Sequence, residues 1–284
     1  MSQTVRCAED LRDIAAQAYE LSGRLCSSCR DLHALWPYIR LSRMSTGVEG
    51  QTSQLETQLR ELFALGLRDT LIAGCADTGL LSLVARAAAN NAPNIVALDI
   101  CETPLELSRR LAGQWSLPIA TIKQDLADLD AKRQFDIVLV HGTLHFIAAD
   151  RRTVALARMQ HSLRPGGRLV LMFNTSQRIR PEAAEQTRRN YADAVLRELR
   201  RLGIALPDAE ATLSDRLYNH SRRREQREGA FARPEDVELL LDRAGFEIER
   251  CVPVDVPMAE PAGGFVAEIS KRRFMAVATP KSGA

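Results

Sequence analysis

The chain has 284 residues, of which 45% are hydrophobic, and a formal net charge of +2. This length provides one large domain, or one domain with an accessory part. The small net charge argues against a dedicated nucleic-acid-binding protein, which usually carries a strong basic excess. The sequence contains no apolar run of the roughly 18 residues that a membrane span needs, and its first residues are polar. We therefore expect a globular, cytoplasmic protein without a membrane segment.

Residues 1–66 are expected to form a helical extension that precedes the first strand. Apolar residues recur there at helical spacing, at Leu11, Ile14, Ala15, Ala18 and Leu21 and again at Leu55, Leu59, Leu62 and Phe63. Between these two stretches, Trp36 and Tyr38 flank a proline. Both aromatic side chains either bind a substrate under a lid formed by the extension, or anchor the N-terminal helices to the core. The sequence does not decide between these interpretations.

The six cysteines are scattered, and only Cys26 and Cys29 form a Cys-x-x-Cys pair. A structural zinc site needs two further ligands at similar spacing, and none follows nearby in the sequence. A redox-active pair is expected at a helix start in a thioredoxin-like context, which is also missing. We therefore predict reduced thiols on a helix and no metal.

The stretch from Thr70 to Asp99 predicts a strand, a tight turn, a helix and a second strand. Gly74 and Gly79 bracket the turn, where the backbone bends sharply or approaches a ligand closely. The second strand, Ile95–Leu98, ends at the acidic residue. An acid about 20 residues past such a turn lies at the edge of the sheet and can bind both hydroxyls of a ribose. The stretch therefore predicts half of a site for an adenosine-containing cofactor.

Strands and helices continue to alternate after this unit. A helix is expected to begin with Thr103 as its N-cap and Pro104 at its first position. Further strands are expected at Leu117–Lys123, Phe135–Val140 and Arg168–Asn174. This alternation predicts an α/β fold with a doubly wound, mostly parallel sheet.

An insertion follows the fifth strand, at about residues 178–230. Pro181–Leu202 has the pattern of an amphipathic helix, and Gly203–Gly229 is polar. The arginine-rich run Ser221–Arg227 either binds an anionic substrate or RNA, or forms a solvated face alternating with acids. We favour the solvated face, because charge runs are usually of that kind.

Five segments in order resemble the class I S-adenosylmethionine-dependent methyltransferases. Residues 74–79 resemble the first motif of that family, and residues 124–126 (Gln-Asp-Leu) are similar to its adenine contact. Phe135–Phe146 looks like its fourth strand with the following loop. Leu163–Leu171 resembles the turn into the fifth strand, and Phe231–Phe246 resembles the last helix. The resemblance covers about two thirds of the chain, from residue 70 onward.

The first motif departs from the usual family pattern, which is an acidic residue followed by G-x-G-x-G. Ile72 stands at the acidic position, Ala76 replaces the middle glycine, and Asp77 with Thr78 lengthens the turn. These departures affect the methionine end of a cofactor site more than the ribose contact from Asp99.

The resemblance implies a seven-stranded Rossmann-like sheet in a domain at residues 67–284, with the insertion as a helical cap. Glu247–Val254 would be strand six, and Phe265–Ala278 its antiparallel partner. The implied cofactor is S-adenosyl-L-methionine, with S-adenosyl-L-homocysteine as product. The matching positions give the cofactor-binding residues Gly74, Cys75, Ala76, Gly79, Asp99, Ile100, Asp125, Leu126 and His141.

Methyl transfer from a sulfonium is an in-line displacement that depends mainly on positioning. His141 and His145 follow the fourth strand, where the cofactor's sulfur is expected, and histidine can accept a proton near neutral pH. In the alternative interpretation, His141 shapes the cofactor pocket and His145 packs or caps a helix. Tyr218 and His220 of the cap are further candidates for binding the acceptor.

We therefore predict an enzyme that methylates a small molecule on oxygen or nitrogen, with the extension and the cap forming the acceptor pocket. No carboxylate set resembles the magnesium site of catechol methyltransferases, which also favours no metal. One alternative is a methyltransferase-fold protein that binds the cofactor without methylating, as a sensor or partner subunit. Another is an RNA methyltransferase, against which the near-neutral charge counts. The predicted partner is a small-molecule acceptor, without membrane or nucleic acid, and a homodimer stays open.

Overall fold

The computed structural model describes residues 10–44, 52–89, 92–175, 181–226, 231–254 and 272–281. Its centre is a seven-stranded sheet in the order β3-β2-β1-β4-β5-β7-β6. The strands are β1 (Asp69–Ala73), β2 (Asn94–Asp99), β3 (Ile119–Lys123), β4 (Phe135–His141), β5 (Leu163–Thr175), β6 (Phe246–Pro253) and β7 (Arg272–Pro280). The pairs from β3 to β5 are parallel, and β7 is antiparallel to both β5 and β6. The predicted mostly parallel, doubly wound sheet is confirmed.

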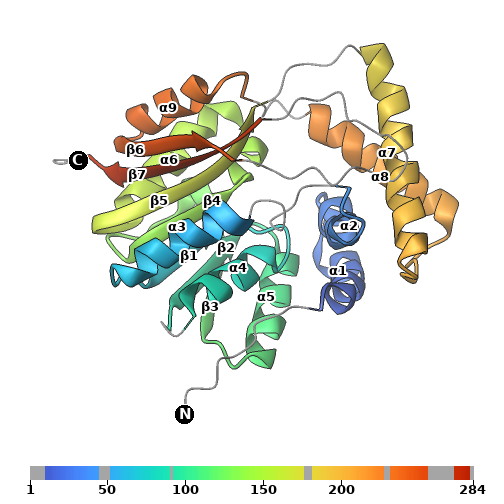
Figure 1. Ribbon diagram of the computed structural model, residues 1–284, viewed down its shortest axis with the longest axis horizontal. Coiled ribbons are helices and arrows are strands. Elements are labelled where there is room, and N and C mark those ends of the chain that lie inside the picture. The colour runs from blue at the N-terminus through green and yellow to red at the C-terminus, as the bar shows by residue number, and fades with distance from the viewer. Residues whose placement is uncertain are drawn as a thin grey trace.

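Helices cover both faces of this sheet (Figure 1). The described α-helices are α1 (Leu11–Leu25), α2 (Arg30–Leu41), α3 (Thr52–Ala64), α4 (Gly79–Ala88), α5 (Glu102–Gln114), α6 (Arg152–Ser162), α7 (Pro181–Arg201), α8 (Glu210–Gln226) and α9 (Pro234–Arg243). Short 3₁₀ turns lie at η2 (Leu126–Asp128), η3 (Thr143–Phe146) and η4 (Ala149–Arg151).

Successive residues of β1 belong to two different apolar clusters, one on each face of the sheet. Ile72 packs in a cluster with residues of α3, α4 and α5, and Leu71 packs in a cluster with residues of α6 and α9. Both side chains are almost fully buried. A parallel sheet covered on both faces requires apolar residues at every position, which explains the unbroken apolar runs of its strands.

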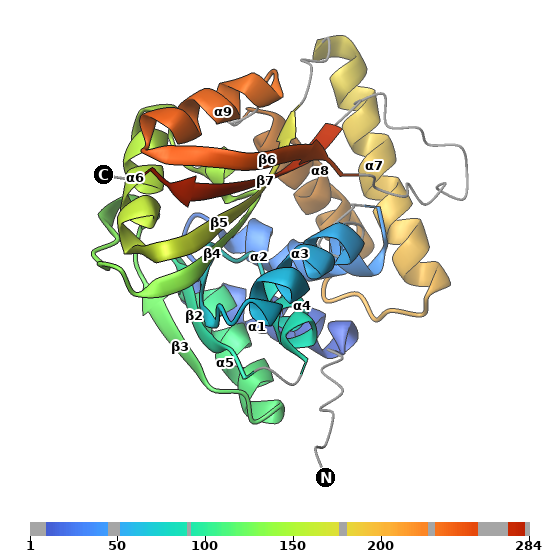
Figure 2. The same cartoon turned by 60° about the vertical axis from the view of Figure 1, so that its left-hand side comes forward.

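A third apolar cluster joins the N-terminal hairpin of α1 and α2 to the cap helices α7 and α8. Its members include Ala15, Leu35, Tyr38, Ile39, Val195, Leu199 and Leu217, and Trp36 packs against it. Figure 1 shows this hairpin between the sheet body and the α7–α8 pair. In the turned view, α7 and α8 lie on the side of the molecule away from β3 (Figure 2). By contrast, α3 packs on α4 as part of the sheet body.

Three local predictions need correction. The helix α5 begins at Glu102 with Cys101 as its N-cap, so the assignment of Thr103 as N-cap is wrong. The Cys26–Cys29 pair does not lie on a helix, because Cys26 is the C-cap of α1 and Cys29 the N-cap of α2. Leu163 already pairs with Phe135, so β5 begins before the expected Arg168. The expected residues 265–271 of strand seven lie outside the described residues.

Among the helices that the structure describes, none combines the length and the apolar character that crossing a membrane requires.

Candidate cofactor site

The predicted cofactor residues meet at the carboxyl ends of four neighbouring strands. Gly74 follows β1, Asp99 ends β2, Asp125 follows β3 and His141 ends β4. Because these strands are adjacent and parallel, their carboxyl ends share one edge of the sheet. Ligands of open α/β sheets bind at this edge.

The turn after β1 has a conformation that only glycine accommodates at position 74. Gly74 has a φ of +86°, and a Cβ there would overlap the side chain of Thr143. The hydroxyl of Thr143 donates a hydrogen bond of 3.0 Å to the carbonyl of Ala73, which holds it against the turn. Sequence analysis did not single out Thr143, because no local pattern shows that the loop after β4 closes on the loop after β1.

Replacing Gly74 by alanine is therefore expected to lower the free energy of unfolding by roughly 1–2 kcal/mol, because the new residue is strained in the left-handed region and collides with Thr143. Chemical denaturation of the variant and the wild type measures the change. Gly113→Ala is the matched control, since a Cβ at that helical position meets nothing within 4 Å. An unchanged stability of Gly74→Ala would contradict the described turn.

Asp99 connects the glycine turn to the start of α5. One carboxylate oxygen accepts a hydrogen bond of 2.9 Å from the amide of Cys75, and the other accepts one of 2.7 Å from the amide of Cys101. Burial raises the pKa of Asp99, and these two amides oppose that rise. Each carboxylate oxygen keeps a further lone pair that can accept from a hydroxyl. The next residue, Ile100, is 67% exposed and provides an apolar surface beside the acid.

Asp125, the residue similar to the adenine contact of the family, already has partners of its own. One oxygen accepts from the amide of Ala127 at 2.8 Å, and the other pairs with the guanidinium of Arg151 at 2.7 Å. The neighbouring Leu126 is buried at the start of η2. Arg151 is a residue that sequence analysis missed, since it reaches this loop from η4.

Asp77, in the lengthened part of the glycine turn, is tied to α2. One oxygen of Asp77 accepts a hydrogen bond of 2.9 Å from the amide of Gly79, and the other lies 2.5 Å from the guanidinium of Arg40. Both charged side chains are almost fully buried, at 1% and 4% exposed. The lengthened turn thus has a buried ion pair at its centre, with the cation supplied from the N-terminal hairpin.

The two candidate catalytic histidines lie in different surroundings. Nε2 of His145 accepts a hydrogen bond of 3.1 Å from the amide of Asn174, and its ring lies 5.2 Å from the ring of Phe231. That lone pair is therefore engaged in holding β5, as the packing interpretation of His145 expects. Burial, together with the positive charge of Arg273, lowers the pKa of His141 to about 4. His141 is thus neutral at physiological pH and can accept a hydrogen bond, and its low pKa makes it a weak base.

The depressed pKa of His141 makes the stability of the protein depend on pH. An unfolded histidine has a pKa near 6.5, so protons favour the unfolded chain once the pH falls below that value. We expect wild type to lose about 1.3 kcal/mol of unfolding free energy between pH 7.5 and pH 5.5 relative to His141→Gln, which does not titrate. Urea denaturation of both proteins at the two pH values measures this difference. If wild type and His141→Gln lost the same unfolding free energy between the two pH values, His141 would not be buried in neutral form.

The four residues predicted to bind the acceptor lie in the helical part of the molecule. Tyr38 is buried, with its ring centroid 6.4 Å from that of Tyr19, and Trp36 packs against the same cluster. The guanidinium of Arg189 lies 5.0 Å from the ring centroid of Tyr218. His220 is 3% exposed. These contacts are those of packed side chains, and the assignment of the four to acceptor binding stays a prediction.

The fold also brings together a group that the sequence separates. Ligand atoms of Cys26, Cys29, His33 and Cys101, which we call the thiol–imidazole cluster, lie within 4.8 Å of one another. A hydrogen bond from Cys26, with a further contribution from His33, lowers the pKa of Cys101. Burial by itself would lower the pKa of His33, but hydrogen bonds with Cys101 and Cys29 raise it to about 10. No further ligand follows the Cys26–Cys29 pair at zinc-site spacing in the sequence. In the folded chain, however, His33 and Cys101 lie beside the pair.

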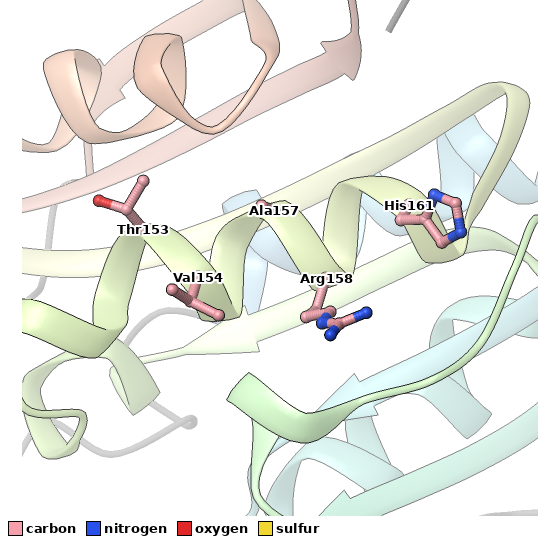
Figure 3. A pocket seen from close by; sticks show the side chains of 5 residues that line it. All are labelled: Thr153, Val154, Ala157, Arg158 and His161. Atoms are coloured by element: carbon pink, nitrogen blue, oxygen red, sulfur yellow. The ribbon is translucent and has the colours of Figure 1, made fainter.

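A surface pocket of about 370 Å³ lies elsewhere, along one helix. Its lining side chains, Thr153, Val154, Ala157, Arg158 and His161, all belong to α6 (Figure 3). None of the predicted site residues lines it.

The seven-stranded order with an antiparallel β7 is the sheet that the resemblance to class I methyltransferases predicted. A methyltransferase domain family matches residues 71–167, which confirms the predicted resemblance. These residues span the glycine turn, Asp99, Asp125 and His141.

Two curated relatives are similar to about a third of the chain, and both are carboxy-S-adenosyl-L-methionine synthases. The one from Pseudomonas fluorescens is 38% identical over 98 residues, which cover 32% of this chain and 38% of the relative. The one from Wolinella succinogenes is 28% identical over 97 residues, covering 34% and 40%. The chain thus aligns with about two fifths of the length of these relatives.

A solved structure is similar over nearly the whole chain. It is the 1,6-didemethyltoxoflavin-N1-methyltransferase of Burkholderia thailandensis with bound 1,6-didemethyltoxoflavin and S-adenosylhomocysteine. It is 17% identical, with a TM-score of 0.52, and the match covers 96% of this chain and 92% of that one. At this identity the similarity concerns the fold alone.

Proposed function

We propose that this protein is an S-adenosylmethionine-dependent methyltransferase that acts on a small molecule. The observation that carries the proposal is the carboxylate of Asp99, which lies at the end of β2 and accepts a hydrogen bond from Cys75 in the glycine turn. An acid in this position can accept hydrogen bonds from both hydroxyls of a ribose. The methyltransferase family match over residues 71–167 supports the same cofactor.

The roles of the other residues follow from their places at the same edge. The exposed side chain of Ile100 offers an apolar face to an adenine ring. S-adenosylmethionine, when bound, supplies a methyl group on a positively charged sulfur. His141, neutral and at the end of β4, accepts a hydrogen bond from the acceptor.

The acceptor is proposed to bind between the sheet edge and the two helical pairs. α2 reaches the glycine turn, because Nδ1 of His33 lies 2.9 Å from the carbonyl of Ala76 and Arg40 pairs with Asp77. The same helix packs against α7 and α8. A site covered by helices of the chain itself suits a small acceptor whose oxygen or nitrogen atom attacks the methyl group.

Calorimetric titration with S-adenosylmethionine and S-adenosylhomocysteine tests the cofactor assignment, with NAD as the control ligand. Micromolar binding of both sulfur compounds and none of NAD is expected. The protein is then incubated with methyl-labelled cofactor and a panel of small hydroxyl and amine compounds. Absence of binding would overturn the proposal, and binding without transfer to any acceptor would favour a cofactor-binding sensor or partner subunit.

The curated relatives support a second candidate function, since both are named as synthases of a carboxylated cofactor. In that case the protein would modify S-adenosylmethionine itself. Mass spectrometry of the cofactor recovered after incubation with candidate carboxylate donors distinguishes the two. A product heavier than S-adenosylmethionine by the added carboxyl group favours the second function, and S-adenosylhomocysteine favours the first.

A further inference from the structure

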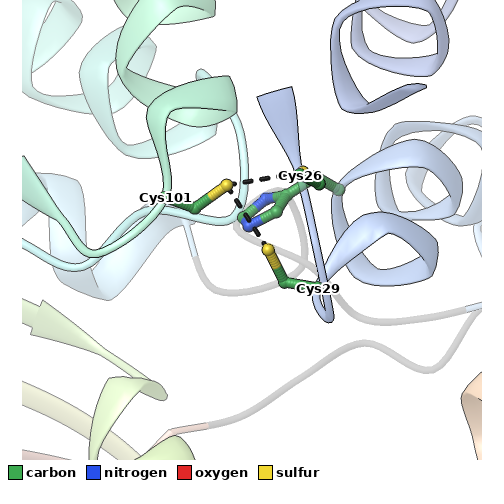
Figure 4. A group of neighbouring side chains, drawn as sticks. Cys26, Cys29 and Cys101 are labelled. Atoms are coloured by element: carbon green, nitrogen blue, oxygen red, sulfur yellow. Dashed lines mark hydrogen bonds between the residues drawn. The ribbon is translucent and has the colours of Figure 1, made fainter. Parts of the chain in front are cut away.

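Three separate elements supply the thiol–imidazole cluster. Cys26 and Cys29 end and begin the helices of the N-terminal hairpin, and His33 lies one turn into α2. Cys101 comes from the sheet body, as the N-cap of α5. Figure 4 shows the sulfur atoms of the three cysteines directed toward one another. Packing of Ala18 and Leu21 of α1 against Leu107 of α5 brings these elements together.

The spacing of the sulfur atoms fits a tetrahedral metal ion. The sulfur of Cys101 lies 3.4 Å from that of Cys26 and 3.4 Å from that of Cys29. Zinc–sulfur bonds of about 2.3 Å in a tetrahedron place two sulfurs about 3.8 Å apart. A disulfide would instead need about 2.05 Å. The cluster therefore needs only a small outward shift to surround a zinc ion.

The imidazole is oriented as a metal-binding histidine usually is. Nδ1 of His33 lies 2.9 Å from the backbone carbonyl of Ala76, so it carries the proton that this hydrogen bond requires. When a metal ion replaces the proton that the neighbouring thiol groups hold on Nε2, the lone pair of this nitrogen forms the ligand bond. Metal-ligating histidines commonly donate their other ring N–H to a backbone carbonyl or a carboxylate in this way. His33 itself is 3% exposed.

We propose that Cys26, Cys29, His33 and Cys101 bind one zinc ion as a closed structural site. Four protein ligands fill the tetrahedral coordination of zinc and leave no position for a substrate. Thiolate and imidazole together suit zinc better than the hard cations that prefer oxygen. On binding, each coordinating thiol gives up its proton to the solvent.

The zinc ion would fasten the N-terminal hairpin to the cofactor edge of the sheet. The amide of Cys101 donates to Asp99, and Ala76, which receives the His33 hydrogen bond, lies in the glycine turn. Zinc would thus hold α2 over the turn. This consequence rests on the proposed function, whereas the metal content of the protein does not. The zinc site and the methyltransferase function can therefore fail separately.

The test is the zinc content of the full chain purified under reducing conditions, measured by plasma mass spectrometry. We expect about one zinc per chain in wild type and less than about a tenth of that in Cys29→Ser and in Cys101→Ser. Both positions are helix N-caps, where serine is among the preferred residues, so folding should be preserved. Cys251→Ser, on β6, is the matched control and should keep its zinc. Equal zinc in Cys101→Ser and wild type would overturn the proposal.

Two measurements on the wild type do not depend on any variant. Titration of the thiols with a mercurial should release the zinc in proportion, as followed with a colorimetric zinc indicator. The cobalt-substituted protein should show the visible absorption of a tetrahedral site and thiolate charge-transfer bands in the near ultraviolet. A protein that takes up neither metal, or in which mass mapping finds Cys26 disulfide-bonded to Cys29 in reducing buffer, would contradict the proposed site.

Discussion

Arg40→Met is expected to lower the free energy of unfolding by about 3–5 kcal/mol. Arg40 and Asp77 form an ion pair at 2.5 Å with both side chains almost fully buried. Methionine retains most of the packing volume of arginine but removes the positive charge. The carboxylate of Asp77 then stays buried beside Gly79 with no cation to pair with. Breaking such a pair from one side costs far more than the pair itself contributes. Denaturant unfolding of the variant measures the loss.

A second substitution separates the charge effect from packing. Asp77→Asn keeps an oxygen to accept from the amide of Gly79 but removes the charge, so the Arg40→Met, Asp77→Asn double variant should recover much of the stability lost by Arg40→Met. Arg60→Met is the control, because Arg60 pairs with Glu56 at an exposed site and should cost less than about 0.5 kcal/mol. Equal losses in Arg40→Met and Arg60→Met would show that the buried pair is not formed.

Asp99→Ala is expected to weaken the binding of S-adenosylhomocysteine by about 10- to 100-fold, which corresponds to about 1.4–2.8 kcal/mol. The substitution removes the proposed acceptor for the ribose hydroxyls. It also removes the oxygens that hold the amides of Cys75 and Cys101, so the glycine turn and the start of α5 lose a shared anchor. Calorimetric titration at constant salt measures the affinity.

The matched control for this loss is Asp150→Ala, an exposed carboxylate of η4, which should leave the affinity within about twofold. Circular dichroism and thermal unfolding of Asp99→Ala show whether the variant is folded before its affinity is interpreted. A folded Asp99→Ala protein that binds as tightly as wild type would remove the observation on which the proposed function rests.

The sequence predicted the sheet well because its signals are local. Unbroken apolar runs marked the parallel strands, and the glycine turn with Asp99 marked the edge of the sheet where the cofactor is proposed to bind. The residues at which helices begin were predicted less accurately. The N-cap of α5, for example, is Cys101, which is not a residue with a strong capping preference. Tyr38 belongs to the third apolar cluster and Trp36 packs against it, contacts that the pattern of aromatic residues alone did not show.

The sequence by itself determined the fold class and the position of the proposed cofactor site. The signals for both, which are apolar strands, a glycine turn and an acidic residue at the end of a strand, lie within about thirty residues of one another. Only the tertiary structure decided what surrounds that site. Arg40 meets Asp77, and Cys101 meets the Cys26–Cys29 pair, across segments that no short-range pattern connects. These residues are brought together by the packing of α1 and α2 against α5 and the cap helices. Such packing depends on complementary surfaces and not on spacing along the chain.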